Sequence, residues 1–155
     1  MKATNSTEPA PKARLRGRTL AEDACPTCGT PMAAKRGRLR MPVNGEQILV
    51  ASATHLACGK CGEIVLSFDE ASRLAEDAIA LYRKKHGLLS ADEIRALRVR
   101  HRFTQAQLAR LLRLGPNTVS RWESGRNAQT GAMDVLLRLI RDVPASLKWL
   151  RGRVA

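Results

Sequence analysis

Four cysteines are the residues of this chain best suited to chemistry. They stand in two pairs, Cys25-Pro-Thr-Cys28 and Cys58-Gly-Lys-Cys61, with 29 residues between the pairs. Two Cys-x-x-Cys turns at this spacing bring four thiolates to the corners of a tetrahedron, which is the geometry that Zn²⁺ prefers. A glycine follows the second cysteine of each pair and permits the tight turn that such a site needs. We therefore predict one Zn²⁺ ion per chain, bound by Cys25, Cys28, Cys58 and Cys61.

The predicted zinc site is structural. Four thiolates fill the coordination shell of zinc and leave no position for a reactive water, so we expect no catalytic residues and no enzyme activity. A thioredoxin-like redox pair is less favoured, because it needs one motif in a βαβ pattern, and disulfides are disfavoured in a reducing compartment. His55 is an alternate ligand in principle, but we expect it on the surface of a strand.

The residues around the cysteines predict a small β domain over 21–69. Residues 35–41 and 47–54 flank Pro42-Val-Asn-Gly45, a turn signal, and a β-rich run follows at 63–68. These segments fit a zinc ribbon of two or three strands. Residues 21–69 hold five basic and five acidic side chains, so the domain has no net charge. This balance favours a protein-binding or scaffolding unit over a nucleic-acid binder.

A second feature, over 104–126, predicts two short helices joined by a tight turn. Thr104 and Gln107 have the spacing of a capping box, which starts the first helix. Apolar residues then recur at the spacing of one helical face (Leu108, Ala109, Leu111 and Leu112). Gly115 is expected to end this helix, and Pro116 to be the first residue of the next.

The second helix of this segment carries side chains suited to reading bases. Asn117 and Arg121 are one turn apart and share a face. An Asn amide pairs with adenine and an Arg guanidinium with guanine in the major groove, whereas the alternative is a solvated surface pair. Hydroxyls beside them and a Gln at the start of the first helix suit phosphate contacts. The predicted DNA-binding residues are Asn117, Arg121, Thr118, Ser120 and Gln105.

The charge of the chain agrees with a polyanionic partner. The formal net charge is +13 and the isoelectric point is about 10.8. Residues 83–126 hold eleven Lys or Arg against three acids, a net +8. No apolar run approaches the length of a membrane span or of a signal peptide, so we expect a cytoplasmic protein without a membrane partner.

The remaining segments complete the domain organisation. Residues 1–20 are rich in Thr, Pro, Ala, Lys and Arg and predict a flexible basic arm, which we expect to be solvated, with phosphate contacts as the alternative. Residues 70–87 predict a linking helix that Ser67 or Asp69 caps and Gly87 ends. Ser90 and Glu93 form a further capping box and open the helix-turn-helix unit at 88–155.

A helix predicted over 130–141 has two apolar stripes and therefore needs two partners. One stripe holds Ala132, Val135, Leu136 and Leu139, and the other holds Met133, Leu137 and Ile140. One partner is the helix-turn-helix core. The second is either the same helix of another subunit or a last helix over 144–150, and the sequence leaves both open.

The motifs resemble two known families. The start Thr104 to Ala109 and the end Thr118 to Gly125 are similar to the Cro/C1-type helix-turn-helix. The order of zinc knuckles, linking helix and helix-turn-helix resembles the MqsA-type antitoxins with their YgiT-type zinc finger, over roughly 25–150. The matching stretches are Cys25-Pro-Thr-Cys28-Gly, Cys58-Gly-Lys-Cys61-Gly-Glu63, Gly87 to Ile94, and Asn117 to Glu123.

The resemblance implies a fold of α+β class: a small zinc-ribbon-like β domain with four cysteine ligands, followed by an all-α Cro/C1-type domain. It also implies an antitoxin of a type II system, in which the first domain binds zinc and sequesters an mRNA-cleaving toxin. The second domain dimerises and represses its operon at a palindrome. An alternative is a stand-alone zinc-containing regulator, or an adaptor that binds another protein without a toxin partner.

Overall fold

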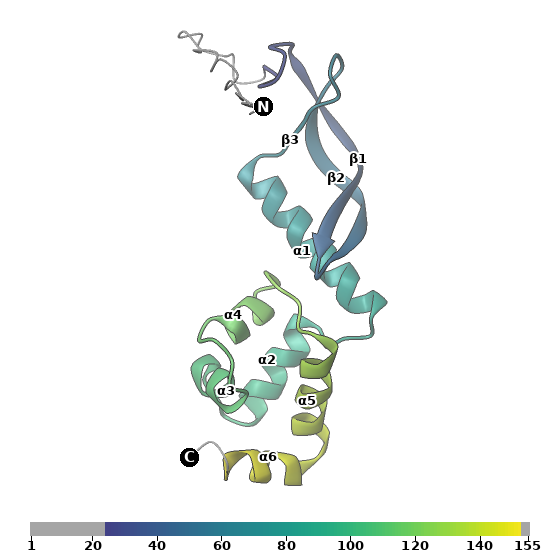
Figure 1. Cartoon of the computed structure of the whole chain (residues 1–155). Helices are drawn as coiled ribbons and strands as arrows, with labels where there is room; N and C mark the ends of the chain where they lie inside the picture. Colours follow the sequence, from purple (N-terminus) through teal and green to yellow (C-terminus); the bar gives the residue numbers. More distant parts are fainter. Residues whose placement is uncertain (1–23, 153–155) are drawn as a thin grey trace, which may run out of the picture.

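The computed structural model describes residues 24–152, and within them it has a three-stranded sheet followed by six helices. Figure 1 shows the sheet and the first helix at one end and the other five helices at the opposite end. The expected α+β class is confirmed, with a small β unit before an all-α unit. The predicted arm at 1–20 lies outside the described residues.

The sheet is a long hairpin with a short third strand. Strand β1 spans Met32–Val43, β2 spans Glu46–Cys58 and β3 spans Ile64–Val65, all antiparallel in the order β1-β2-β3. Asn44 and Gly45 both have positive φ, 48° and 83°, as a two-residue hairpin turn requires. The predicted turn is therefore confirmed, and the first two strands are longer than the sequence indicated.

Helix α1, Phe68–Lys85, packs along the sheet. Ser67 caps it, with Glu70 completing a capping box. Its buried face holds Leu74 and, one turn later, Ala78 and Ile79. They join a core with residues of the two long strands (Val43, Ile48, Val50 and Ala53). The helix ends at Gly87 as predicted, because Gly87 has a φ of +60° and the N–H of Leu88 donates to the carbonyl of Arg83 at 2.9 Å.

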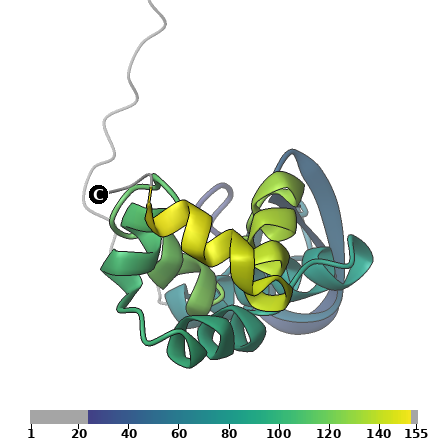
Figure 2. The ribbon, with the colours of Figure 1, turned by 90° about the horizontal axis from the view of Figure 1, so that it is seen from below.

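The second core belongs to the five remaining helices, which Figure 2 shows from below. They are α2 (Ala91–Arg100), α3 (Gln105–Leu111), α4 (Thr118–Glu123), α5 (Gly131–Asp142) and α6 (Pro144–Arg151). Their fully buried residues include Leu89, Ile94, Leu108, Val119, Leu137 and Ile140. The capping boxes predicted at Ser90 and Thr104 are confirmed.

Two details of the predicted helix-turn-helix are wrong. Helix α3 ends at Leu111, where Arg113 with a φ of 55° closes it, and Gly115 is not the stop. The N–H of Leu114 reaches back to the carbonyl of Ala109 at 2.8 Å, the bond of a Schellman cap. Pro116 lies in a turn in which the N–H of Thr118 donates to the carbonyl of Gly115 at 3.0 Å. The fixed φ of proline suits the second position of such a turn.

Helix α5 leaves part of one apolar stripe outside the core, whereas Leu136 of the same stripe packs against the core. Leu137 and Ile140 are fully buried, with Met133 packed against them, whereas Val135 is 58% exposed and Leu139 is 43% exposed. Helix α6 adds Leu147 to the core without covering those two residues. Over residues 24–152, no helix combines the length and the apolar character needed to cross a membrane.

Candidate metal centre and nucleic-acid interface

The two cysteine knuckles have the same backbone geometry. The N–H of Cys25 donates to the carbonyl of Thr30 at 2.9 Å, and that of Cys58 to the carbonyl of Glu63 at 2.9 Å. Each knuckle also has a glycine with positive φ, at Gly29 and Gly62, with φ of 73° and 76°. The prediction that these glycines permit the tight turns is confirmed.

The antiparallel pairing of β1 and β2 brings the knuckles together, since Met32 lies opposite Cys58. All four sulfur atoms then lie within 4.8 Å of one another. The Sγ atoms of Cys25 and Cys61 are 3.5 Å apart, as are those of Cys28 and Cys58. A tetrahedral zinc ion with Zn–S bonds of about 2.3 Å places its sulfurs about 3.8 Å apart. The cluster therefore fits zinc, and the ion would contribute folding free energy by tying both knuckles to one point.

The surroundings of the sulfurs favour thiolates at two positions. Hydrogen bonds from the side chain and backbone of Thr30 lower the pKa of Cys28 to about 6. Hydrogen bonds with the backbone of Cys61 and Lys60 lower the pKa of Cys58. The backbone of Glu63 lowers the pKa of Cys61, but the contact with Cys25 and burial outweigh it and raise that pKa to about 12. A bound metal displaces such protons, because it ligates thiolates.

His55 does not lie on the strand surface, and this expectation is wrong. The ring is buried, and its Nδ1 lies 3.0 Å from the carbonyl oxygen of Ala53. His55 faces the side of the sheet that α1 covers, at the Lys35 register, and the metal-binding group of the described residues does not include it. The polar and apolar residues around His55 did not indicate which face of the strand a helix would cover.

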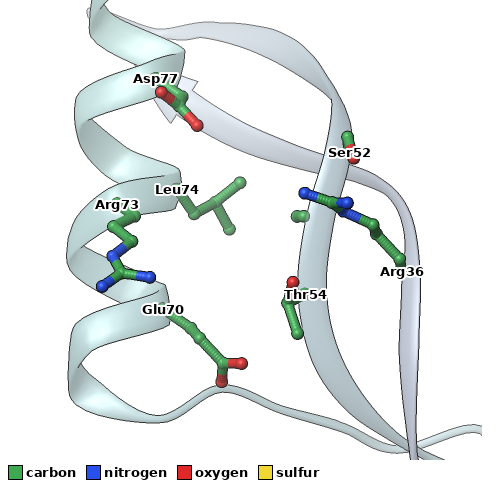
Figure 3. A pocket seen from close by; sticks show the side chains of 8 residues that line it. Arg36, Ser52, Thr54, Glu70, Arg73, Leu74 and Asp77 are labelled. Atoms are coloured by element: carbon green, nitrogen blue, oxygen red, sulfur yellow. The ribbon is translucent and has the colours of Figure 1, made fainter.

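A groove lies between the sheet and α1. It encloses about 290 Å³, and Figure 3 shows Arg36 reaching across from β1 toward the helix. Arg73 and Asp77 line the helix side and Leu74 points into the gap. Within residues 24–152, none of Arg36, Arg73 and Asp77 forms an ion pair with another side chain. The groove therefore presents charges of both signs to the solvent.

The helix-turn-helix presents the predicted base-reading residues to solvent. Val119 and Trp122 are buried and fix one side of α4 against the core. Asn117, at the N-cap, and Arg121, one turn later, are exposed on the other side. Thr118 and Ser120 are half-buried on the same short helix.

Gln105 is held by a buried carboxylate. Its Nε2 donates to Glu123 at 2.8 Å, at the first residue of α3. Arg98 donates to both carboxylate oxygens of Glu123, at 2.6 and 2.9 Å, and Arg95 lies 3.8 Å away. Burial raises the pKa of Glu123, but hydrogen bonds from Arg98 and Gln105 outweigh it and hold that pKa below its usual value. Glu123 is therefore a carboxylate that orients Gln105.

A comparison with known protein families shows which family the chain belongs to. Residues 23–151 match the family described as the antitoxin component of a bacterial toxin-antitoxin system, MqsA. The chain belongs to the MqsA antitoxin family. The match includes all four cysteines and the whole helix-turn-helix, so the resemblance drawn from the sequence is confirmed. The comparison of this MqsA-family chain with curated proteins found no match.

Three buried polar residues of this antitoxin-family chain were not expected from the sequence. They are Arg83, Gln129 and Asp134. Asp134 accepts hydrogen bonds from the N–H of Leu89 at 2.7 Å and from Nε of Arg138 at 2.6 Å. A polar residue inside an apolar helical stripe was the available signal, at position 83 of α1 and at position 134 of α5.

Proposed function

We propose that this protein is a zinc-stabilised DNA-binding repressor and the antitoxin of a type II toxin-antitoxin pair. The observation that best supports this proposal is a short helix with Trp122 buried on one side and Asn117 and Arg121 exposed on the other. This helix belongs to a chain of the MqsA family. The role is regulatory and not enzymatic. A bacterial repressor of this kind acts in the cytoplasm, where its operon lies.

In this proposal α4 enters the major groove and Arg121 and Asn117 contact base edges. The hydroxyls of Thr118 and Ser120 and the amide of Gln105 contact phosphates. Support for the role of Gln105 comes from its hydrogen bond to Glu123, which fixes its amide at the N-terminus of α3. The exposed cations Arg110, Arg113 and Arg126 add electrostatic attraction that does not depend on sequence.

The zinc ion is proposed to be structural, with Cys25, Cys28, Cys58 and Cys61 as its ligands. The four sulfur atoms lie within 4.8 Å of one another, which supports this proposal. Four cysteine ligands are also typical of structural zinc sites.

A second copy of the chain is proposed to cover the exposed stripe of α5, and the dimer then reads both halves of a palindrome. Val135, Leu139 and Val143 recur every four residues and are each exposed by two fifths or more. Exposed apolar patches mark protein contacts, and the two-fold dimer is the commonest assembly of identical chains.

The toxin partner is proposed to bind the β unit. The groove between α1 and the sheet supports this, because its exposed Arg36, Arg73 and Asp77 offer both signs of charge to a protein surface. Co-expression with the neighbouring reading frame tests this part. Co-purification of a small mRNA-cleaving protein supports the antitoxin role, whereas isolation of the chain alone favours the stand-alone regulator.

The DNA-reading role is tested by Arg121→Ala. We expect this change to weaken binding to the duplex upstream of its own gene by about 1 to 3 kcal/mol, and to weaken binding to a random duplex far less. Arg110→Ala is the matched control, since it removes an exposed cation of α3 and should weaken both duplexes alike. Equal losses on both duplexes for Arg121→Ala would remove it from base reading.

A further inference from the structure

Helix α1 carries a buried guanidinium where its apolar face meets the second core. Arg83 is only 5% exposed, and its burial lowers its pKa. It forms no ion pair with any carboxylate of residues 24–152. A buried charge of this kind is costly unless its donors are all used, so its hydrogen bonds determine what it holds in place.

Within residues 24–152, Arg83 has three acceptors, and all lie at the end of α4 or in the segment that follows it. Its Nη2 donates to the carbonyl oxygens of Trp122 at 2.9 Å and Asn127 at 3.0 Å. Its Nε donates to Oε1 of Gln129 at 3.1 Å. One side chain of α1 therefore grips the carboxyl end of the proposed DNA-reading helix.

The segment after α4 also enters the core of the sheet. Ala128 is buried among the residues that pack α1 on β1 and β2. Asn127 and Arg126 line a crevice of about 240 Å³ with Pro42 of β1 and the turn residue Asn44. The connection between the two cores thus has an apolar contact beside the polar one.

The polar network continues beyond Arg83 and uses the remaining groups of Gln129. Its Nε2 donates to the carbonyl of Leu89 at 2.7 Å and to Oδ1 of Asp134 at 3.1 Å. The side chain of Gln129 is fully buried. Satisfied polar networks of this kind fix the relative position of the elements that they join.

We propose that Arg83 is a positioning residue for DNA reading. It clamps the carboxyl end of α4 to α1, so that the sheet unit and the helical unit approach DNA as one rigid body. This inference rests on the proposed function, in which α4 reads bases. It adds that specific affinity depends on a buried side chain of α1 that is not itself part of the proposed DNA surface.

The rigid-body part is tested on the wild-type chain without DNA. Amide ¹⁵N relaxation of the full-length protein should give one rotational correlation time for residues of β1 and β2 and for residues of α2 to α6. Two different correlation times would overturn the proposal, whether or not the protein binds DNA. This measurement therefore separates the clamp from the proposed repressor function.

The positioning part is tested by Arg83→Met, with Lys84→Met as the control on the adjacent, exposed position. We expect Arg83→Met to weaken binding to the upstream duplex at least about tenfold, because buried carbonyls lose their donor. Binding to a random duplex should change by less than about twofold, because that binding depends on the surface charge that remains. The variant should also show two correlation times.

Arg83→Lys covers the case in which Arg83→Met does not fold. It keeps the charge but offers a single donor group, and we expect an intermediate loss of affinity for the upstream duplex. Arg83 variants that fold, tumble as the wild type does and bind the upstream duplex as tightly as Lys84→Met would overturn the proposal.

Discussion

Glu123 lies at the centre of the charged contacts around the helix-turn-helix. Its side chain is almost fully buried, and it joins α2 through Arg98 to α3 through Gln105. Removal of one partner from such a group leaves the others unsatisfied, which costs more than the bond itself contributed. The position of α4 relative to α2 and α3 thus depends on one ionised carboxyl group.

We expect Glu123→Gln to lower the free energy of unfolding at pH 7 by about 2 to 3 kcal/mol. The folded-state pKa of Glu123 is lowered, so its contribution is present above the ordinary carboxyl pKa and is lost as pH falls through the folded value. The difference between wild type and variant should therefore shrink below about pH 4. Denaturant unfolding at several pH values measures this, and a difference that stays constant with pH would contradict it.

At this scale the sequence predicted placements that depend on local signals. The clustering of the cysteines follows from their spacing, and the exposure of Asn117 and Arg121 follows from helical periodicity around Val119 and Trp122. Arg83 and Gln129 could not be predicted, because they are 46 positions apart and only the packing of two cores brings them together. A cation in an amphipathic helix is more often solvated than buried.

The stability of the hairpin is linked to the metal site formed by the two knuckles. Two ligands precede the start of β1 and the other two lie at the end of β2 and just after it. A bound ion therefore holds these two strand ends together at the open end of the hairpin. Neither apolar core of residues 24–152 includes a cysteine of the knuckles, and that end is otherwise held by polar contacts such as the hydrogen bond from Thr27 to Glu63 at 3.1 Å. Metal binding should therefore be a large part of the stability of this element.

We expect the purified protein to hold one zinc ion per chain. Cys28→Ser should lose the ion, and its melting temperature should fall by at least about 10 °C because the hairpin end opens. Elemental analysis and thermal unfolding with and without a chelator measure this. Restoration of the wild-type melting temperature by added zinc is the control, and a chelated protein with an unchanged melting temperature would contradict the structural role.

Helix starts that carry a capping box were easier to predict than the two boundaries on either side of the turn between α3 and α4. Capping boxes at Ser90 and Thr104 are local in sequence and were predicted correctly. The end of α3 was not, because Arg113 adopts the left-handed conformation that glycine usually takes, with a φ of 55°. Gly115 was the residue that the sequence favoured for that place, two positions late.

The whole molecule is proposed to act as a dimer through α5, and Leu139→Glu tests this. A charge in the exposed apolar stripe should shift sedimentation from dimer to monomer, because it places unpaired carboxylates in the contact. Leu81→Glu is the matched control, since Leu81 has a similar exposure, 41% against 43%, on α1. A dimer that survives Leu139→Glu would place the contact elsewhere.

The arrangement of the two apolar cores was the feature of the whole molecule that the sequence predicted least well. A linking helix over 70–87 was expected, whereas the observed α1 belongs to the core of the sheet through Leu74, Ala78 and Ile79. This packing depends on a register between distant strands that no local signal reports. The two apolar stripes of α5 were visible in the sequence, but which of them the chain itself covers was not.

The length of the hairpin separates two ends of the protein. Strand β1 has 12 residues, so it spans roughly 36 Å from the cysteine knuckles to the Asn44 turn. Figure 1 shows the knuckles at the end away from the helical unit. The proposed toxin site lies in the groove between the sheet and α1, and the proposed DNA surface lies on α4 of the helical unit. In this arrangement one molecule has room to bind both partners simultaneously.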